Sequence, residues 1–268
     1  MSIRRVLAAP GFIVAVLASS VAHAAAVPVR FPEGVVHGFL TLATPAGKIL
    51  ADGDSIQFAR GDRVTSRLVF RFRDGSLQDE TTVFLQRDRF ELLTDHMIQK
   101  GPSFPHPIEI TIDRPAGHVT VRTTGKDGRE ETIDRRMELP ADLANGLVPT
   151  LLKNLPAGAG KTSAPYLAAT PKPSIVTLAL SRDGGDTISV GSSRRKAQRW
   201  VVHVELSGIK GVLAKLLGKQ PPDTHIWILG GDAPTFLRSE SPAWFGGPMW
   251  VIRLSAPAWP EASSADSR

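Results

Sequence analysis

The chain has 268 residues, of which 42% are hydrophobic and 22% are charged, a composition typical of a globular protein and unlike that of a disordered one. No cysteine is present, which excludes disulfides, thiolate metal sites, a cysteine nucleophile and lipid attachment through an N-terminal cysteine. The formal net charge of +6 suits anionic partners such as phospholipid head groups, but charge alone assigns no function.

Residues 1–24 have the pattern of a signal peptide. Arg4 and Arg5 precede an apolar run over 6–18, and small residues follow up to an A-x-A cleavage site at 22–24. The run is shorter than the roughly 20 residues of a membrane-spanning helix, and no later segment is long enough, so we expect no transmembrane anchor in the mature chain. The expected location is periplasmic or secreted after cleavage near Ala24, where nucleic acid is not an expected partner.

Short alternating runs separated by turn signals dominate the first half of the mature chain and predict an antiparallel meander with one buried face. Phe70 and Phe72 belong to such a run, which ends at the hairpin signal Asp74-Gly75. A second run predicts a strand with five residues on one face, namely Phe90, Leu92, Thr94, His96 and Ile98. Similar runs follow at 108–112 and 119–121, and a polar strand is expected at 131–137.

The hydrophobic period changes at Pro140, where apolar residues begin to recur at helical spacing. They are Leu143, Leu147, Val148, Leu151 and Leu152. The pattern predicts a central helix over 143–152, kinked or split because Gly146 and Pro149 lie inside it.

Strands are expected again after a Pro- and Gly-rich loop at 156–173. They are predicted at 175–180, 187–190, 198–206, 224–229, 235–239 and 249–254, with a turn at Gly184-Gly185 and a short apolar helix at 209–217. The predicted fold class is mainly β (α+β), with one domain over 25–260. We expect a curved antiparallel sheet or half-barrel with the central helix packed on its concave side, and a disordered tail at 261–268.

Four segments resemble a group of uncharacterised exported bacterial proteins: RFRDGSLQDE at 71–80, QKGPSFP at 99–105, ATPKP at 169–173 and GKQPPDTHIWILGG at 218–231. The C-terminal part also resembles periplasmic half-barrel domains related to the LolA and LolB lipoprotein carriers, through Trp227, Asp232, Pro234, Glu240 and Gly247. This resemblance implies a curved antiparallel sheet that holds acyl chains in its hollow. It implies no catalytic motif.

Two motifs suggest nucleotide or metal chemistry, but each lacks a required partner. The segment GAGKT at 158–162 resembles the end of a phosphate-binding loop, yet Leu155 stands where the first glycine is needed. His203 and Glu205 share one strand face and could hold a metal or act as a base and its orienter, but no third ligand is identifiable. Because Trp200 and Val202 take the other face, His203 and Glu205 are expected to face solvent.

The remaining polar pairs assign no catalytic residue. Adjacent Asp95 and His96, like adjacent Asp79 and Glu80, point to opposite faces of a strand. Without a second carboxylate at a known separation, no glycosidase acid and base can be argued. Asp223 and His225 share a face beside Trp227 and could form a polar rim, or a loop cap and a strand-edge histidine. No metal or cofactor is predicted, and an enzyme with His96, His203 or His225 as its base is a less favoured alternative.

Aromatic residues in alternating strands favour a binding protein for an apolar or amphipathic, lipid-like ligand held between the sheet and the helix. The predicted ligand-binding residues are Phe70, Phe72, Phe90, His96, Leu147, Leu151, Trp227, Trp244 and Phe245. Packing of the helix could equally require such aromatic residues. The glycine-flanked loop at 241–249 predicts an exposed entrance or docking surface at Trp244 and Phe245, against the alternative that both belong to the core.

A structural or interaction protein of the cell envelope is the second hypothesis. It rests on the densest basic cluster, Arg194, Arg195, Lys196 and Arg199, which could dock an envelope protein or a lipid surface. The same cluster also fits a solvated strand edge that is kept from aggregating by its charges.

Overall fold

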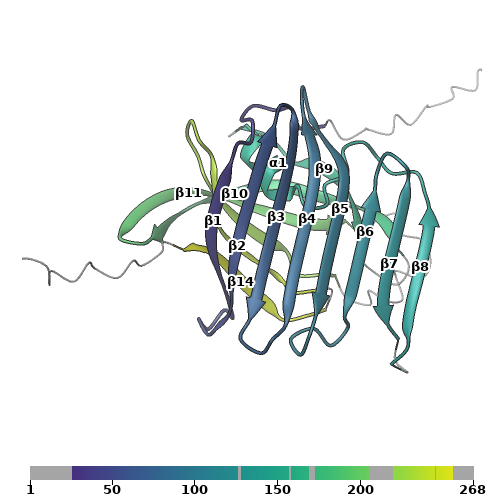
Figure 1. Ribbon diagram of the computed structural model, residues 1–268. Coiled ribbons are helices and arrows are strands. Elements are labelled where there is room, and N and C mark those ends of the chain that lie inside the picture. Colours follow the sequence, from purple (N-terminus) through teal and green to yellow (C-terminus); the bar gives the residue numbers. More distant parts are fainter. Residues whose placement is uncertain are drawn as a thin grey trace, which may run out of the picture.

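The computed structural model describes residues 26–125, 128–156, 158–168, 173–205, 220–244 and 246–255. Within these residues there is one short helix, α1 (Val148–Asn154), and the strands all belong to a single sheet (Figure 1). In chain order the strands are β1 (Val36–Ala43), β2 (Ile49–Arg60), β3 (Arg63–Phe72), β4 (Leu77–Gln86), β5 (Phe90–Lys100), β6 (Ile108–Asp113), β7 (His118–Thr124), β8 (Glu130–Arg136), β9 (Thr162–Ala168), β10 (Ser174–Val190), β11 (Ser193–Glu205), β12 (Thr224–Leu229), β13 (Thr235–Pro242) and β14 (Met249–Ser255).

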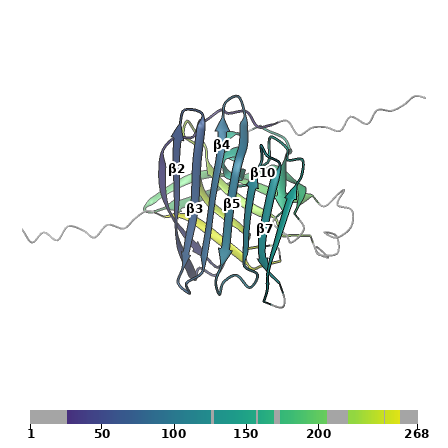
Figure 2. The ribbon, with the colours of Figure 1, turned by 45° about the vertical axis from the view of Figure 1, so that its right-hand side comes forward.

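The sheet consists of two meanders joined edge to edge. The strand order is β8-β7-β6-β5-β4-β3-β2-β1-β14-β13-β12-β11-β10-β9, so only the pair β1 and β14 joins strands that are distant in sequence. Every pair is antiparallel, and no pairing between β8 and β9 closes the sheet within the described residues. Figures 1 and 2 show the first meander as one wall, with the second crossing behind it and α1 in the space between them. The predicted mainly β class and curved antiparallel sheet are confirmed.

Side chains on the inner face of the sheet form two separate apolar clusters. Along β3, Val64 belongs to the larger cluster, which also contains most of the buried residues around α1, whereas Phe70 belongs to a smaller aromatic cluster. Between them on the same face lie Ser66 and Leu68. The inner face therefore changes from apolar to mixed and back to apolar along the strand.

The helix is shorter than predicted and begins later. It starts at Val148 rather than at residue 143, because Gly146 has a φ of +66°, a left-handed conformation that interrupts a right-handed helix. Pro149 lies in the first turn, where it is tolerated. Leu143 and Leu147 are buried as expected, but they lie in the turns that precede the helix.

One long strand, β10, replaces the two strands predicted at 175–180 and 187–190. The glycine pair forms a bulge instead of a turn, since Gly184 has a φ of +78° and the register with β11 shifts between Arg182 and Gly185. The β10–β11 hairpin consequently extends past the sheet, as seen at the left of Figure 1.

A second bulge, in β5, changes which face of the sheet its later side chains occupy. Val83 of β4 pairs with Thr94, whereas Phe84 pairs with Leu92, so Leu93 is an extra residue. An extra residue moves all later side chains to the opposite face. The prediction of one shared face from Phe90 to Ile98 is therefore wrong, because Asp95 faces the interior and His96 faces outward.

Several predicted features lie outside the described residues: the signal peptide at 1–24, the apolar helix at 209–217, Phe245 and the tail at 261–268. Among the helices that the structure describes, none is long and apolar enough to span a membrane.

Candidate ligand-binding cavity

A cavity of about 1820 Å³ lies between the two meanders. Inner-face residues of both meanders line it, together with α1 and residues 30–34, which we call the entry segment. Its volume exceeds the roughly 300–1,000 Å³ typical of a small-molecule pocket. The lining reaches exposed positions such as Val36 and Ala233, so the cavity opens to solvent.

Most of the lining is apolar. The apolar side chains come from strands of both meanders: Leu40, Leu68, Met97, Val176, Leu178, Val202, Val204, Ile226, Ile252 and Leu254. Polar side chains on the same faces include Ser55, Gln57, Ser66, Glu80, Thr82, Gln99, Tyr166, Thr224 and Ser239. An apolar interior with a small number of placed polar groups is the usual character of a ligand site.

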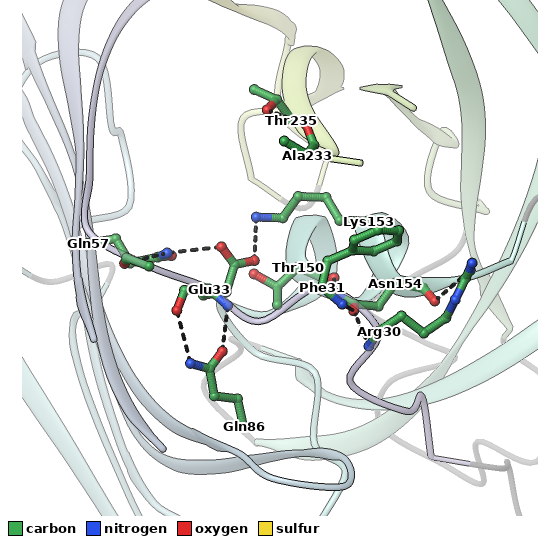
Figure 3. A network of polar contacts seen from close by, with 11 residues as sticks. Arg30, Phe31, Glu33, Gln57, Gln86, Thr150, Lys153, Asn154, Ala233 and Thr235 are labelled. Carbon is green, nitrogen blue, oxygen red and sulfur yellow. Dashed lines mark hydrogen bonds and ion pairs between the residues drawn. The ribbon is translucent and has the colours of Figure 1, made fainter. Parts of the chain in front are cut away.

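The entry segment is fixed to α1 through Asn154, whose side chain is fully buried. Its Oδ1 accepts hydrogen bonds from the backbone nitrogens of Arg30 and Phe31, at 2.8 and 2.7 Å, and its Nδ2 donates to the Thr150 carbonyl oxygen at 2.9 Å (Figure 3). Because this one amide satisfies three backbone groups, it holds the segment and the helix in a fixed relation.

Glu33 connects the entry segment to the sheet. Its carboxylate accepts a hydrogen bond from Gln57 Nε2 at 2.9 Å and forms an ion pair with Lys153 of α1. The Glu33 backbone exchanges two further hydrogen bonds with the side chain of Gln86 (Figure 3). The Lys153 and Glu33 side chains, only 17% and 8% exposed, therefore neutralise each other in the cavity wall.

A second polar group lies on the inner face of β4 and β5. Thr82 Oγ1 donates a hydrogen bond to Asp95 Oδ1 at 2.7 Å, and Asp95 is only 2% exposed. Burial raises the pKa of the Asp95 carboxyl to about 6, against the lowering effect of the Thr82 hydroxyl. Burial, with the nearby Asp95 charge second, raises the pKa of the Glu80 carboxyl to about 8. Burial and these two acids also raise the pKa of the Tyr166 hydroxyl on β9.

Gly146 brings the turn before α1 against this acidic group. A β-carbon on residue 146 would lie 1.9 Å from Thr82 Oγ1, closer than any two such atoms can approach. Only glycine combines this contact with the positive φ at this position. The turn thereby covers the Thr82–Asp95 pair on one side.

Aromatic rings close one end of the cavity. Trp244, which lines the cavity, has its ring centroid 6.0 Å from that of Phe104 and 5.9 Å from that of Trp250. Phe72 lies 5.2 Å from Trp250 in the same cluster. Trp244 is half-buried among these rings, so it is neither a freely exposed docking residue nor a fully enclosed core residue.

The predicted ligand-binding residues fall into five groups. Trp244 lines the cavity, and Phe70 and Phe72 belong to the aromatic cluster beside it. The larger core cluster contains Phe90, Leu147 and Leu151, none of which lines the cavity. Phe245 lies outside the described residues, and His96 and Trp227 are on the outer face.

The two outer-face residues are engaged in contacts of their own. His96 Nε2 lies 2.9 Å from Glu109 Oε1, a position that follows from the bulge at Leu93. Trp227 Nε1 donates to Asp186 Oδ2 at 2.7 Å. Its ring also lies 4.9 Å from the Arg238 guanidinium carbon. Both placements correct the prediction that these side chains face the ligand.

The other polar candidates also lie away from the cavity wall. His203 Nδ1 is 2.7 Å from Asp223 Oδ1, and Glu205 pairs with Lys161 at 2.7 Å, so the expectation that His203 and Glu205 face away from the core holds. His225 packs beside Trp227 on the same outer face, so no polar rim to the cavity forms there. Among the described residues no group of three His, Asp or Glu could hold a metal ion.

The sequence argument missed Glu80 and Tyr166 as cavity residues and Asp95 as a buried residue of the inner face. One signal was available for Glu80: it is in phase with Thr82 and Phe84, so an inward Phe84 implies an inward Glu80.

Comparison with known proteins assigns no family. No family model matches the chain, and no curated protein matches it. A solved β-barrel-like protein of a domain of unknown function, DUF1849, from Brucella abortus is similar to it with a TM-score of 0.44 and 12% identity, over 86% of this chain and 100% of that chain. None of these comparisons links the chain to the LolA and LolB carriers or to an activity.

Proposed function

We propose that the chain is exported and binds an amphipathic, lipid-like ligand in the cavity between its two meanders. The observation that carries this proposal is the cavity of about 1820 Å³, open to solvent and lined mostly by apolar side chains. A predicted signal peptide at 1–24 and the resemblance of the C-terminal part to half-barrel carriers favour the same ligand class and an envelope location.

The lining explains why an amphipathic ligand fits better than a wholly polar one. Each methylene group transferred from water to an apolar wall contributes about 0.8 kcal/mol, so a long alkyl chain gains affinity with every added carbon. The polar side chains on the same walls, such as Gln57 and Glu80, provide hydrogen-bond partners for a head group. A small polar solute would leave the apolar surface uncovered.

Native mass spectrometry and lipid extraction after expression in a bacterial periplasm test this function. A Ser66→Trp variant, whose indole would project into the cavity and occupy part of it, should reduce the amount of co-purified amphiphile. Thr65→Trp is the matched control, because Thr65 is next to Ser66 on β3 and its side chain lies on the outer face. The proposal is contradicted if the wild-type protein repeatedly purifies without a bound lipid and does not bind hydrophobic dyes.

An interaction protein of the envelope is the second candidate, favoured by the position of the basic cluster. Arg194, Arg195 and Lys196 are exposed near the end of the projecting β10–β11 hairpin, whereas Arg199 forms ion pairs with Asp183 and Asp186. Crosslinking in cells should show partners that disappear when the three exposed residues are changed to glutamate. If every crosslinked partner persists, this candidate fails.

A further inference from the structure

We propose that Glu80, with Asp95 and Tyr166 beside it, is the polar recognition point of the cavity and that the ligand presents a cationic amine to it. This inference rests on the proposed ligand-binding function and specifies the head group of the ligand.

Glu80 is a carboxyl group without a partner in an apolar setting. It lines the cavity from the middle of β4, where it pairs in register with Leu68 of β3 and Met97 of β5. No hydrogen bond or ion pair to another described residue satisfies it. A buried ionisable group that lacks a partner is unfavourable, so a chain that places one in its ligand cavity gains when a complementary ligand group arrives.

Two further polar groups converge on the same place from different parts of the sheet. Asp95 comes from β5, with one carboxylate oxygen held by Thr82, and Tyr166 comes from β9 on the other meander. Glu80 and Tyr166 line the same cavity from the two meanders, and Thr82, which holds Asp95, lines it two residues from Glu80 on β4. An ammonium group has three donors and no acceptor, and the Glu80 carboxyl and the Tyr166 hydroxyl offer it acceptors on the cavity wall. The buried Asp95 carboxyl adds negative charge that acts on Glu80.

The other charges of the lining leave no comparable site for an anion. Lys153 is neutralised by Glu33, and Arg30, which keeps its charge, is an exposed residue of the lining. Glu131 and Asp232 add negative charge at exposed positions of the lining. A positively charged ligand group therefore complements the charges of this cavity.

The inference includes a change of protonation. Burial and the neighbouring Asp95 keep Glu80 protonated near neutral pH, since its pKa is raised to about 8. A bound ammonium favours the carboxylate, so the Glu80 proton leaves to solvent when the amine binds. Amine affinity should consequently increase as pH rises from 6 to 9, while the affinity for an uncharged ligand of equal chain length should not. Among the described residues, the Asp95 charge acts on the Glu80 carboxyl, and the Glu80 charge acts on the Tyr166 hydroxyl.

Dodecylammonium and dodecanol, titrated below their aggregation limits into the full chain at pH 9, test the inference by calorimetry. Glu80→Gln keeps the size of the side chain but removes its charge, and it should weaken amine binding about 10- to 100-fold while changing dodecanol binding less than about threefold. Asp79→Asn is the matched control, since it removes the same charge one residue away on the outer face, where Asp79 pairs with Arg67 at 2.5 Å.

The outcomes separate this inference from the function on which it rests. If both probes bind but Glu80→Gln leaves amine affinity unchanged, the amine site is refuted and ligand binding stands. If neither probe binds the wild-type chain, both fail. Should Glu80→Gln not fold, the pH series on the wild-type chain decides, because equal pH profiles for the amine and the alcohol overturn the inference.

Discussion

Replacing Glu80 by glutamine should stabilise the unliganded chain, and the gain should increase with pH. Below about pH 4.5, the ordinary pKa of the carboxyl, it is protonated in both the folded and the unfolded chain and has no effect. As pH rises to about 8, the unfolded chain releases a proton that the folded chain retains, so folding becomes less favourable. Above that value the folded chain contains a buried carboxylate, and the full penalty applies.

The size of the effect follows from the raised pKa. A rise from 4.5 to about 8 corresponds to on the order of 5 kcal/mol in the free energy of unfolding. Glu80 faces a cavity that opens to solvent, and water there stabilises the carboxylate, so we expect about 2 to 5 kcal/mol at pH 9 and almost none at pH 4. Glutamine introduces no charge and keeps the shape of the side chain, so the comparison isolates the ionisation.

Urea unfolding followed by circular dichroism at pH 4, 6 and 9 measures this difference. Asp79→Asn should change stability by less than about 1 kcal/mol, because it breaks only a partly exposed ion pair with Arg67. A stability difference between Glu80→Gln and the wild type that stays constant from pH 4 to 9 would show that Glu80 is hydrated like a surface residue, and would refute the position assigned to it.

Three further substitutions test the packing around the cavity, each by urea unfolding. Gly146→Ala should destabilise the chain by about 2 to 4 kcal/mol, because it combines a positive φ with a β-carbon at 1.9 Å from Thr82 Oγ1; an effect under about 0.5 kcal/mol would contradict this contact. Asn154→Ala should cost about 2 to 4 kcal/mol, since two backbone N–H groups of the entry segment lose their acceptor. Trp244→Ala should cost about 1 to 3 kcal/mol, less than a fully buried tryptophan, and a loss above 4 kcal/mol would place it in the core.

The strand pattern was largely predictable from the sequence, because alternation depends on local geometry. The run that contains Phe70 and Phe72 forms β3 with those two side chains buried, and the inward position expected for Trp200 and Val202 on β11 is also confirmed. Turns between consecutive strands need no distant partner, so a meander can be inferred from its turn signals. The pairing of β1 with β14 has no such local signal.

Glycines account for the main errors in the predicted elements. Gly184 was expected to end a strand, and Gly146 was expected to lie within a helix. Each has a positive φ, but the first gives a bulge inside the continuous strand β10 and the second ends the turns that precede α1. The sequence shows where the backbone is free to adopt this conformation. Whether the chain then turns, bulges or begins a helix depends on the strands and side chains that pack against it.

The candidate site depends on the bulge at Leu93 in β5 and on the β1–β14 pairing that joins the two meanders. Without the bulge at Leu93, strict alternation along β5 would place His96 in the interior and Asp95 outside, which is the arrangement that the sequence pattern predicted. With it, Asp95 joins Glu80 on the inner face, and the pairing of β1 with β14 lets the second meander bring Tyr166 to the wall of the same cavity as Glu80. Glu80 and Tyr166 thus line one cavity, with Asp95 buried on the same inner face, although no spacing in the sequence connects the three residues. Chemistry assembled in this way is visible only when the register of each strand is known.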